Sequence, residues 1–487
     1  MWHVHRTSAS SGLTGPAGSG LEGGLEDDPA GSTPTGSGPA GRLDDSGGPD
    51  SPGAGDATHA RPPRSRLAGW IAPEWMNRDL AIVMIARGLM SVARALAGVV
   101  VPIYLALQGF SALELGLLFL CVAFTSAILS SSIGLVSDRI GRRPFLVALP
   151  LFAAGAGLVF AFSDNTALLF VAASFGSFGR GAGASAGAVG PYQPAESALV
   201  TEAIVPQWRN SIFGRLAFMS SIGALGGGLL ALLAGSGHPV GAAAVAMFRP
   251  AFIAASLFAA LAGIVAIWIA EPRIPSREAG HRQKISLPRR SRSLLYRLWA
   301  TNSINGFAIG MFGPFVAYWF YRRYGVGVGE IGVLFAAINF VTAFSSLSAA
   351  GLARRYGLVR TMTAVRAIQA ILLVPMVLMP NFELAGAIYL IRMVVQRIAM
   401  PLRQSYVLAM AHPEERASLA ALSNVPSQFA MAASPTLAGY LFDEVSLSLP
   451  FELTAVLQML NAGMFWGFFH NLPPEEERVT SLAQDDP

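Results

Sequence analysis

A succession of long apolar stretches is the feature that most constrains the fold of this chain. A helix needs roughly 20 apolar residues to cross about 30 Å of hydrocarbon. About twelve stretches are long enough, at residues 80–107, 113–136, 145–163, 167–203, 210–235, 245–270, 297–321, 330–353, 361–379, 383–405, 416–441 and 449–470. None alternates polar and apolar residues with the period of a transmembrane β-strand. The sequence therefore predicts an all-α polytopic membrane protein with about twelve transmembrane helices.

The composition agrees with a membrane protein, since 53% of the residues are hydrophobic and only 13% are charged. A mean hydropathy of +0.50 would make a water-soluble chain of this length prone to aggregate. The net charge is +5, but the basic residues are distributed among the connections between apolar stretches and do not form one patch. We therefore expect the lipid bilayer and a small-molecule substrate as partners, and no nucleic acid.

Residues 1–75 have a different composition, rich in Gly, Ser, Pro and Asp and poor in aromatic residues. Such a segment cannot bury enough apolar surface to offset the entropy cost of folding. It contains no apolar stretch followed by a small-residue cleavage site, so we expect the first span itself to direct insertion. Residues 1–75 are predicted to be a disordered cytoplasmic tail, and residues 471–487 a second, short cytoplasmic tail.

Basic residues mark alternate connections between the spans. The second-to-third connection carries Arg139, Arg142 and Arg143, whereas the first-to-second, third-to-fourth and eleventh-to-twelfth connections carry none. The long connection at residues 271–296 carries Arg273, Arg277, Arg282, Lys284, Arg289, Arg290 and Arg292. By the positive-inside rule, these basic connections and both termini are cytoplasmic. We expect a multi-pass protein of the plasma (inner) membrane.

The two halves of the chain resemble each other. The segment Glu114–Phe119 (ELGLLF) has a counterpart in Glu330–Phe335 (EIGVLF). Pro194, Pro206 and Arg209 likewise match Pro401, Pro413 and Arg416. An internal duplication of this kind predicts two pseudo-symmetric six-helix bundles, at residues 76–270 and 297–470, with a site at their interface. The basic loop at residues 271–296 joins them.

The connection after the second span reads GLVSDRIGRRP, from Gly134 to Pro144. This run resembles the signature loop of the major facilitator superfamily in its residues Gly134, Asp138, Arg139, Gly141, Arg142 and Arg143. The resemblance, closest to bacterial efflux-type permeases, implies the major facilitator fold, transport by alternating access, and a conformational gating role for these six residues. The matching run in the second half has Arg354 where Asp138 stands, so a symmetric pair of gating carboxylates is not expected.

The fourth span is similar to the superfamily's pattern for that helix, with Arg180 followed by Pro194, Glu202, Pro206 and Arg209. It departs from the pattern in a long glycine-rich run, residues 179–191. We expect this run either to break the helix beside a cavity or to pack closely against neighbouring helices.

Charged side chains inside a membrane are costly unless they serve a cavity or a partner. Arg94 falls near the middle of the first span, where it either binds an anionic substrate or pairs with Glu196 or backbone carbonyls. Arg87 lies nearer the inner interface and is expected to snorkel. Arg180 is a candidate for substrate binding, coupling or packing. Glu196 is the candidate for proton coupling. Asn302 and Asn305 are further candidate substrate-binding groups.

The leading hypothesis is a secondary active transporter, acting as a monomer in proton-coupled efflux of a small solute. The fifth-helix antiporter pattern is degraded to Gly223–Gly228 (GALGGG), which weakens this assignment. An organic-anion uniporter or exchanger, favoured by the excess of embedded arginine, is the alternative, and a non-transporting membrane sensor is a remote one. The sequence lacks a phosphate-binding loop, a nucleophile elbow and paired metal ligands, so we expect no enzyme activity, cofactor or metal.

Overall fold

The computed structural model describes residues 76–179, 191, 193–203, 208–235, 242–270, 290–345, 356–410, 415, 419 and 422–471. All of these belong to one compact unit, Ser65–Pro487. Every regular element in the described residues is a helix. The predicted tail at residues 1–75, all but the first residue of the predicted tail at residues 471–487, and residues 271–289 of the predicted loop at residues 271–296 lie outside the description.

The helices follow the predicted spans in order. They are α2 (Arg78–Leu107), α3 (Ala112–Ile140), α4 (Arg143–Phe162), α5 (Thr166–Gly176), α6 (Gln193–Ala203), α7 (Arg209–Leu230) with η2 (Ala231–Ala234), α8 (Ala242–Ala266), α9 (Arg292–Phe312), η4 (Gly313–Phe315), α10 (Val316–Tyr324), α11 (Val328–Ser345), α13 (Leu358–Leu378), α14 (Phe382–Met410), α16 (Val425–Glu444) and α17 (Leu449–Phe469). Each predicted span contains at least one of them, which confirms the all-α polytopic fold.

Length and hydropathy alone identify six of the described segments as able to cross a membrane: Arg78–Leu107, Ala112–Ile133, Arg143–Phe162, Ser211–Ala234, Ala246–Ala266 and Leu358–Leu378. The remaining helices are shorter or carry more polar residues. Several boundaries differ from the predicted ones. Within the eleventh predicted span α16 begins at Val425, α3 continues to Ile140, α9 begins at Arg292 inside the predicted loop at residues 271–296, and α14 continues to Met410. The backbone of residues 134–140 therefore forms the last turns of α3, and only Gly141 and Arg142 separate it from α4.

The repeated glutamates have the same role at the start of two helices. Ser111 and Glu114 form a capping box at α3, in which the Glu114 carboxylate accepts the Ser111 N–H at 2.8 Å. The Glu330 carboxylate accepts the Gly327 N–H at 2.6 Å in the first turn of α11. Both side chains satisfy a backbone donor at a helix N-terminus. The sequence repeat thus reflects a local structural repeat.

The fourth span is interrupted after α5. Ser177 adopts the left-handed conformation with φ of 49°, which ends the helix. Gly179 also has a positive φ, and a Cβ there would lie 2.7 Å from Cγ1 of Val101 on α2. Only glycine combines this backbone conformation with so close an approach. The helix resumes at Gln193, and most of the intervening glycine-rich run lies outside the described residues.

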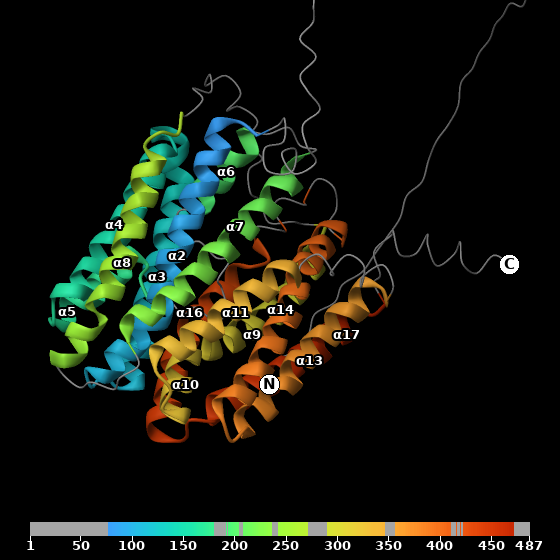
Figure 1. Cartoon of the computed structure of the whole chain (residues 1–487). Helices are drawn as coiled ribbons and strands as arrows, with labels where there is room; N and C mark the ends of the chain where they lie inside the picture. The colour runs from blue at the N-terminus through green and yellow to red at the C-terminus, as the bar shows by residue number, and fades with distance from the viewer. Residues whose placement is uncertain are drawn as a thin grey trace, which may run out of the picture. The chain divides into compact units, whose positions relative to one another are not determined.

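Figure 1 shows α2 to α8, coloured blue to yellow-green, as one group of helices and α9 to α17, yellow to red, as another. Within the first group α2 packs against α7 and α8, and within the second α9 packs against α16 and α17. The groups meet chiefly where α3 contacts α16 and α7 contacts α11. Small residues permit this approach: a Cβ on Gly116 would lie 2.5 Å from the Pro435 carbonyl oxygen.

Candidate functional site

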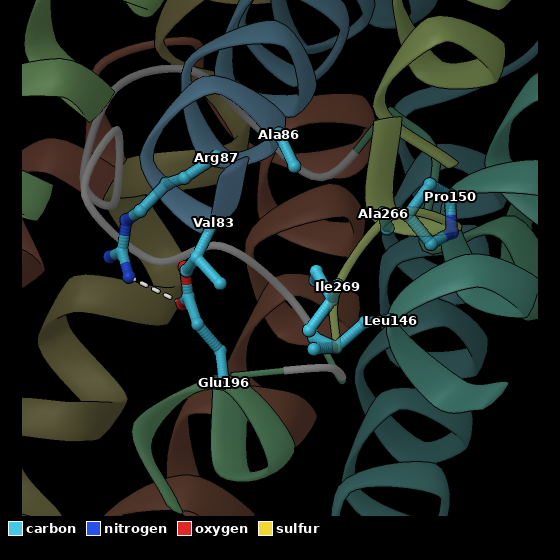
Figure 2. Close-up of a pocket in the computed structure, with 8 residues that line it drawn as sticks. All are labelled: Val83, Ala86, Arg87, Leu146, Pro150, Glu196, Ala266 and Ile269. Carbon is cyan, nitrogen blue, oxygen red and sulfur yellow. Dashed lines mark hydrogen bonds and ion pairs between the residues drawn. The ribbon is translucent and has the colours of Figure 1, made fainter. Parts of the chain in front are cut away.

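A buried ion pair and a hydrogen bond from the same arginine join three of the N-terminal helices. Nη1 of Arg87, on α2, lies 2.5 Å from Oε2 of Glu196, on α6. Nε of the same guanidinium donates a hydrogen bond of 2.7 Å to Oγ of Ser220, on α7. The two charged side chains are only 7% and 2% exposed. Figure 2 shows Arg87 and Glu196 pointing toward one another from their separate helices.

The ion pair lies in the wall of a small hollow. Its empty volume is about 270 Å³, and its lining consists of Val83, Ala86, Arg87, Leu146, Pro150, Glu196, Ala266 and Ile269. Six of these eight residues are apolar, from α2, α4 and the end of α8 (Figure 2). That volume includes space open to solvent, and the enclosed part of the hollow is far too small for a substrate site. It does place the charged pair against apolar surroundings, where electrostatic interactions are strong.

Such surroundings make the charge of each partner depend on the other. Taking two charges out of water is costly, and the mutual attraction offsets the cost only while the pair stays together. A carboxylate left alone in an apolar site becomes neutral by taking up a proton. The stability of each charge therefore depends on the contact between α2 and α6.

The structure gives Arg87 a role that differs from the expected one. The sequence predicted that Arg87 would snorkel to the interface, but its side chain is buried and binds Glu196. Arg94, the predicted alternative partner of Glu196, lies about two helical turns further along α2 and is half-buried. The signal was present in the sequence, since Arg87 and Glu196 both fall in the inner part of their spans. Ser220 had no such signal and was not predicted.

Both predicted asparagines lie on α9, the first of the C-terminal helices. Asn302 is buried in α9, and its Nδ2 donates a hydrogen bond of 2.9 Å to the Ser423 carbonyl oxygen, which ties α9 to the residues before α16. Asn305 is half-buried one turn further on. In this structure Asn302 therefore connects two segments of the C-terminal group of helices through a backbone carbonyl.

The predicted gating residues lie at the end of α3. Gly134, Asp138 and Arg139 belong to its last turns, although their side chains fall outside the description. Gly141 has a φ of 99°, which glycine adopts without strain, and ends α3 through a hydrogen bond of 2.9 Å from its N–H to the Ser137 carbonyl. Arg142 is half-buried and Arg143 is exposed as the first residue of α4. Arg180 lies outside the described residues.

Comparison with known proteins identifies the family. The sequence pattern of the Major Facilitator Superfamily matches residues 83–395 and 298–485. The uncharacterized membrane protein YJR124C of Saccharomyces cerevisiae is 22% identical over 428 residues, which cover 80% of this chain and 95% of the yeast protein.

Solved transporters share the fold at low sequence identity. A bacterial homolog of the human lysosomal transporter Spinster, inward-facing and unoccupied, has a TM-score of 0.62 at 15% identity, covering 82% of this chain and 97% of its own. A D-xylose–proton symporter has a TM-score of 0.60 at 15% identity, covering 80% and 97%. The human organic anion transporter MFSD10 has a TM-score of 0.54 at 17% identity, covering 80% and 100%. With the family pattern matched over most of its helices, the chain belongs to the major facilitator superfamily.

Proposed function

We propose that this protein is a secondary active transporter that moves a small solute by alternating access and couples its movement to protons. The observation that carries the proposal is the buried ion pair between Arg87 and Glu196. The transporter acts as a monomer in the plasma (inner) membrane, with both termini in the cytoplasm. Transport is directed outward, as the similarity of its signature run to efflux-type permeases implies.

The coupling step follows from the position of the pair. Arg87 and Glu196 come from α2 and α6, and Ser220 from α7, so a movement that separates these helices breaks the pair. The isolated carboxylate then takes up a proton from the side to which it is open. When the site has opened to the other side and the pair forms again, Arg87 displaces that proton, which leaves to that side. One proton is thereby carried for each cycle. Proton coupling of this kind is chemistry that the fold can host, because the similar D-xylose–proton symporter is named for it.

The test uses purified protein in liposomes loaded with the pH indicator pyranine. Xylose, benzoate and its neutral analogue benzamide are added outside in separate runs, with and without an imposed pH gradient. Benzoic acid crosses the bilayer by itself as the neutral acid, so rates are compared with protein-free liposomes. We expect at least one solute to move protons faster than in those liposomes with the wild type and none to do so with Glu196→Gln, because an amide of the same shape cannot ionise. Solute movement itself should persist in that variant.

Glu330→Gln is the matched control, since Glu330 caps a helix at 2.6 Å from a backbone N–H and lies away from the pair. It should retain proton movement. Proton-coupled flux that survives Glu196→Gln would remove this carboxylate from the mechanism. A chain that moves no solute under any gradient would instead act as a membrane sensor.

A second candidate is an organic-anion uniporter or exchanger. The observation that favours it is a second buried arginine, Arg392, in the C-terminal helices, where the described spans carry acidic residues only in their first or last turns. Flux of benzoate that is insensitive to the pH gradient would support this candidate over proton coupling.

A further inference from the structure

A cluster of aromatic side chains encloses Arg392 in the C-terminal helices. Arg392 lies on α14, is 1% exposed, and places Cζ 4.2 Å from the centroid of the Phe312 ring on α9. Its Nη1 and Nη2 approach the side-chain oxygens of Gln396 and Gln458, each at 3.4 Å. These distances are long for hydrogen bonds to a charged donor, which are normally about 2.7–2.9 Å. Arg392 is thus a buried cation held only by a ring and two distant amides within the described part of the chain.

Three buried polar groups of this cluster have no hydrogen-bond partner among the described residues. They are Nε of Arg392, the hydroxyl of Tyr389 and Nε1 of Trp319. Tyr389 precedes Arg392 by about one turn of α14, so both side chains lie on one face of that helix. The two nitrogens can only donate, and the hydroxyl can donate as well. Buried polar groups are normally satisfied, so these three groups are able to bind an acceptor.

Ring contacts connect these three groups. The Tyr389 ring centroid is 5.7 Å from that of Phe312, and Phe312 is 5.3 Å from Phe451 on α17. Phe451 in turn lies 4.7 Å from Trp319 on α10. Arg392, Tyr389 and Trp319 therefore border one continuous aromatic surface. A ligand that filled this cluster would meet the donors of Arg392 and Tyr389 at one end, aromatic faces along its body, and the Trp319 N–H beyond Phe451.

No carboxylate of the described C-terminal helices serves as the acceptor. Glu330, Glu383 and Glu452 lie in the first turns of α11, α14 and α17, and Asp443 and Glu444 lie at the end of α16. Helices α9, α10 and α13 contain no acidic residue. A lone buried guanidinium is costly, and carboxylate is the group that its planar fork binds best.

The wall of the cluster contains an interruption of a helix. Immediately after Phe312, the chain passes from α9 into one turn of tighter helix, Gly313–Phe315, before α10 begins at Val316. Pro314 supplies no backbone N–H there, and its ring disfavours a regular α-helical bond. Short segments of this kind mark hinges, and interrupted helices border substrate sites in other membrane transporters.

We propose that this cluster is the binding site for an organic anion with an aromatic body and a carboxylate. Arg392 and Tyr389 bind the carboxylate, and Phe312 and Phe451 pack against the ring of the ligand. The proposal rests on the proposed transport function, because the cluster is closed in this structure: Arg392, Tyr389 and Trp319 are at most 1% exposed. The ligand enters when movement at Gly313–Phe315 parts α10 from α14.

The test measures binding by the melting temperature of the purified full chain in detergent. Two matched pairs of probes separate charge from shape: benzoate with benzamide, and indole-3-acetate with indole-3-acetamide. We expect the carboxylates to raise the melting temperature of the wild type in a concentration-dependent way, and the neutral amides to have no effect. Tyr389→Phe should weaken carboxylate binding about tenfold, and Arg392→Gln should abolish it.

Arg366→Gln is the matched control. Arg366 is also buried, stacks at 4.4 Å on the Phe465 ring, and donates to Asn461 at 2.6 Å, away from the cluster. Its loss should lower the melting temperature but leave the shift caused by carboxylates unchanged. Arg392→Lys keeps the positive charge and is the second test variant, used in case Arg392→Gln does not fold. It should elute as a monodisperse protein and bind the carboxylates at least about tenfold more weakly.

Three results would overturn the proposal: no stabilisation of the wild type by either carboxylate, equal stabilisation by the amides, or full stabilisation of the Arg392 variants. Liposome flux separates this outcome from failure of the transport function. Movement of xylose without carboxylate binding leaves transport intact and removes the site. Carboxylate binding that depends on Arg392, without flux of any solute, leaves the site intact and removes transport.

Discussion

The carboxylate of Asp443, at the end of α16, caps the first turn of α3. Its Oδ2 accepts the Leu113 N–H at 2.8 Å, and its Oδ1 accepts the Ala112 N–H at 3.1 Å. The first N–H groups of a helix lack partners within the helix, and their partial positive charge attracts a carboxylate. Gly439 packs beneath this contact against the Ala112 carbonyl. A residue of the C-terminal group of helices thus caps the N-terminus of a helix in the N-terminal group.

Asp443→Asn should favour the conformation in which this end of the molecule is open. The amide retains one acceptor atom but loses the charge and the second hydrogen bond. Loss of a cap costs about 1 kcal/mol, which corresponds to about a fivefold rise in the open population. A cysteine at Phe119, which packs at 5.4 Å against the Phe315 ring, reports the opening by its rate of reaction with a maleimide that cannot cross the membrane.

This measurement uses a chain in which the exposed Cys121 is first replaced by Ser. Glu444→Gln is the control, because Glu444 is the exposed neighbour of Asp443 at the end of α16. We expect its labelling rate to equal that of the parent chain. Equal rates for Asp443→Asn and Glu444→Gln would show that the cap does not stabilise the closed end.

The polytopic all-α fold and the approximate positions of the spans in the described residues could be predicted from the sequence, because a membrane-spanning helix needs only length and hydropathy, which are local properties. Repeated glutamates were equally readable, since Glu114 and Glu330 act on donors only a few residues away. The partner of Glu196 could not be predicted in the same way, because Arg87 and Arg94 lie on one face of α2 and differ only in their position along the helix axis. Which of them meets Glu196 depends on how α2 packs against helices that are distant in sequence.

The Arg392 cluster shows the same limit. Its side chains come from α9, α10, α14 and α17, and nothing in the local sequence brings Phe312 and Gln458 to Arg392. What the sequence does contain is the charge imbalance of the C-terminal spans. That imbalance predicts an anion somewhere in the membrane region, and only the packing of helices gives its position.

Removing one member of the Arg87 and Glu196 pair should destabilise the protein more than removing both. Breaking a buried pair leaves one charge uncompensated and costs about 3–5 kcal/mol, whereas replacing both charges is often nearly neutral. We expect Arg87→Gln and Glu196→Gln each to lower the melting temperature clearly, and the double variant to recover part of the loss. A double variant with the sum of the two losses would show that the side chains act independently.

The pH dependence of these variants gives a second test of the pair. In Arg87→Gln the carboxylate of Glu196 has lost its cation, and protonation relieves the cost of burying its charge. The native state of this variant then binds a proton more readily than the unfolded chain does, so its stability rises as the pH falls. In Glu196→Gln no such carboxylate remains, and the melting temperature should lack this rise. Both curves are measured against the wild type in the same buffers.

The contact between α7 and α11 should be sensitive to a single methyl group. A Cβ on Gly228 would lie 2.7 Å from the carbonyl oxygen of Gly332, which belongs to the facing backbone and cannot move aside cheaply. Gly228→Ala should therefore cost about 1–3 kcal/mol in the conformation described here and shift the protein away from it. We expect faster labelling of the cysteine at Phe119. Gly226→Ala is the control, because its Cβ would have only Val92 nearby, at 3.8 Å.

Arg94 tests whether the N-terminal helices contribute a second contact to an anionic solute. It is half-buried on α2, about two turns beyond Arg87 and nearer the predicted middle of the membrane. If its guanidinium binds the carboxylate, Arg94→Lys keeps the charge but loses the planar fork, so affinity for indole-3-acetate falls while the melting temperature without ligand is unchanged. Arg94→Ala should lose roughly 2–5 kcal/mol of binding free energy.

An arginine that only stabilises the fold gives the opposite result, with both variants melting at lower temperature and the folded fraction binding normally. Affinity and melting temperature are therefore measured on the same purified samples, and normal affinity in Arg94→Ala would confine the anion site to the cluster around Arg392.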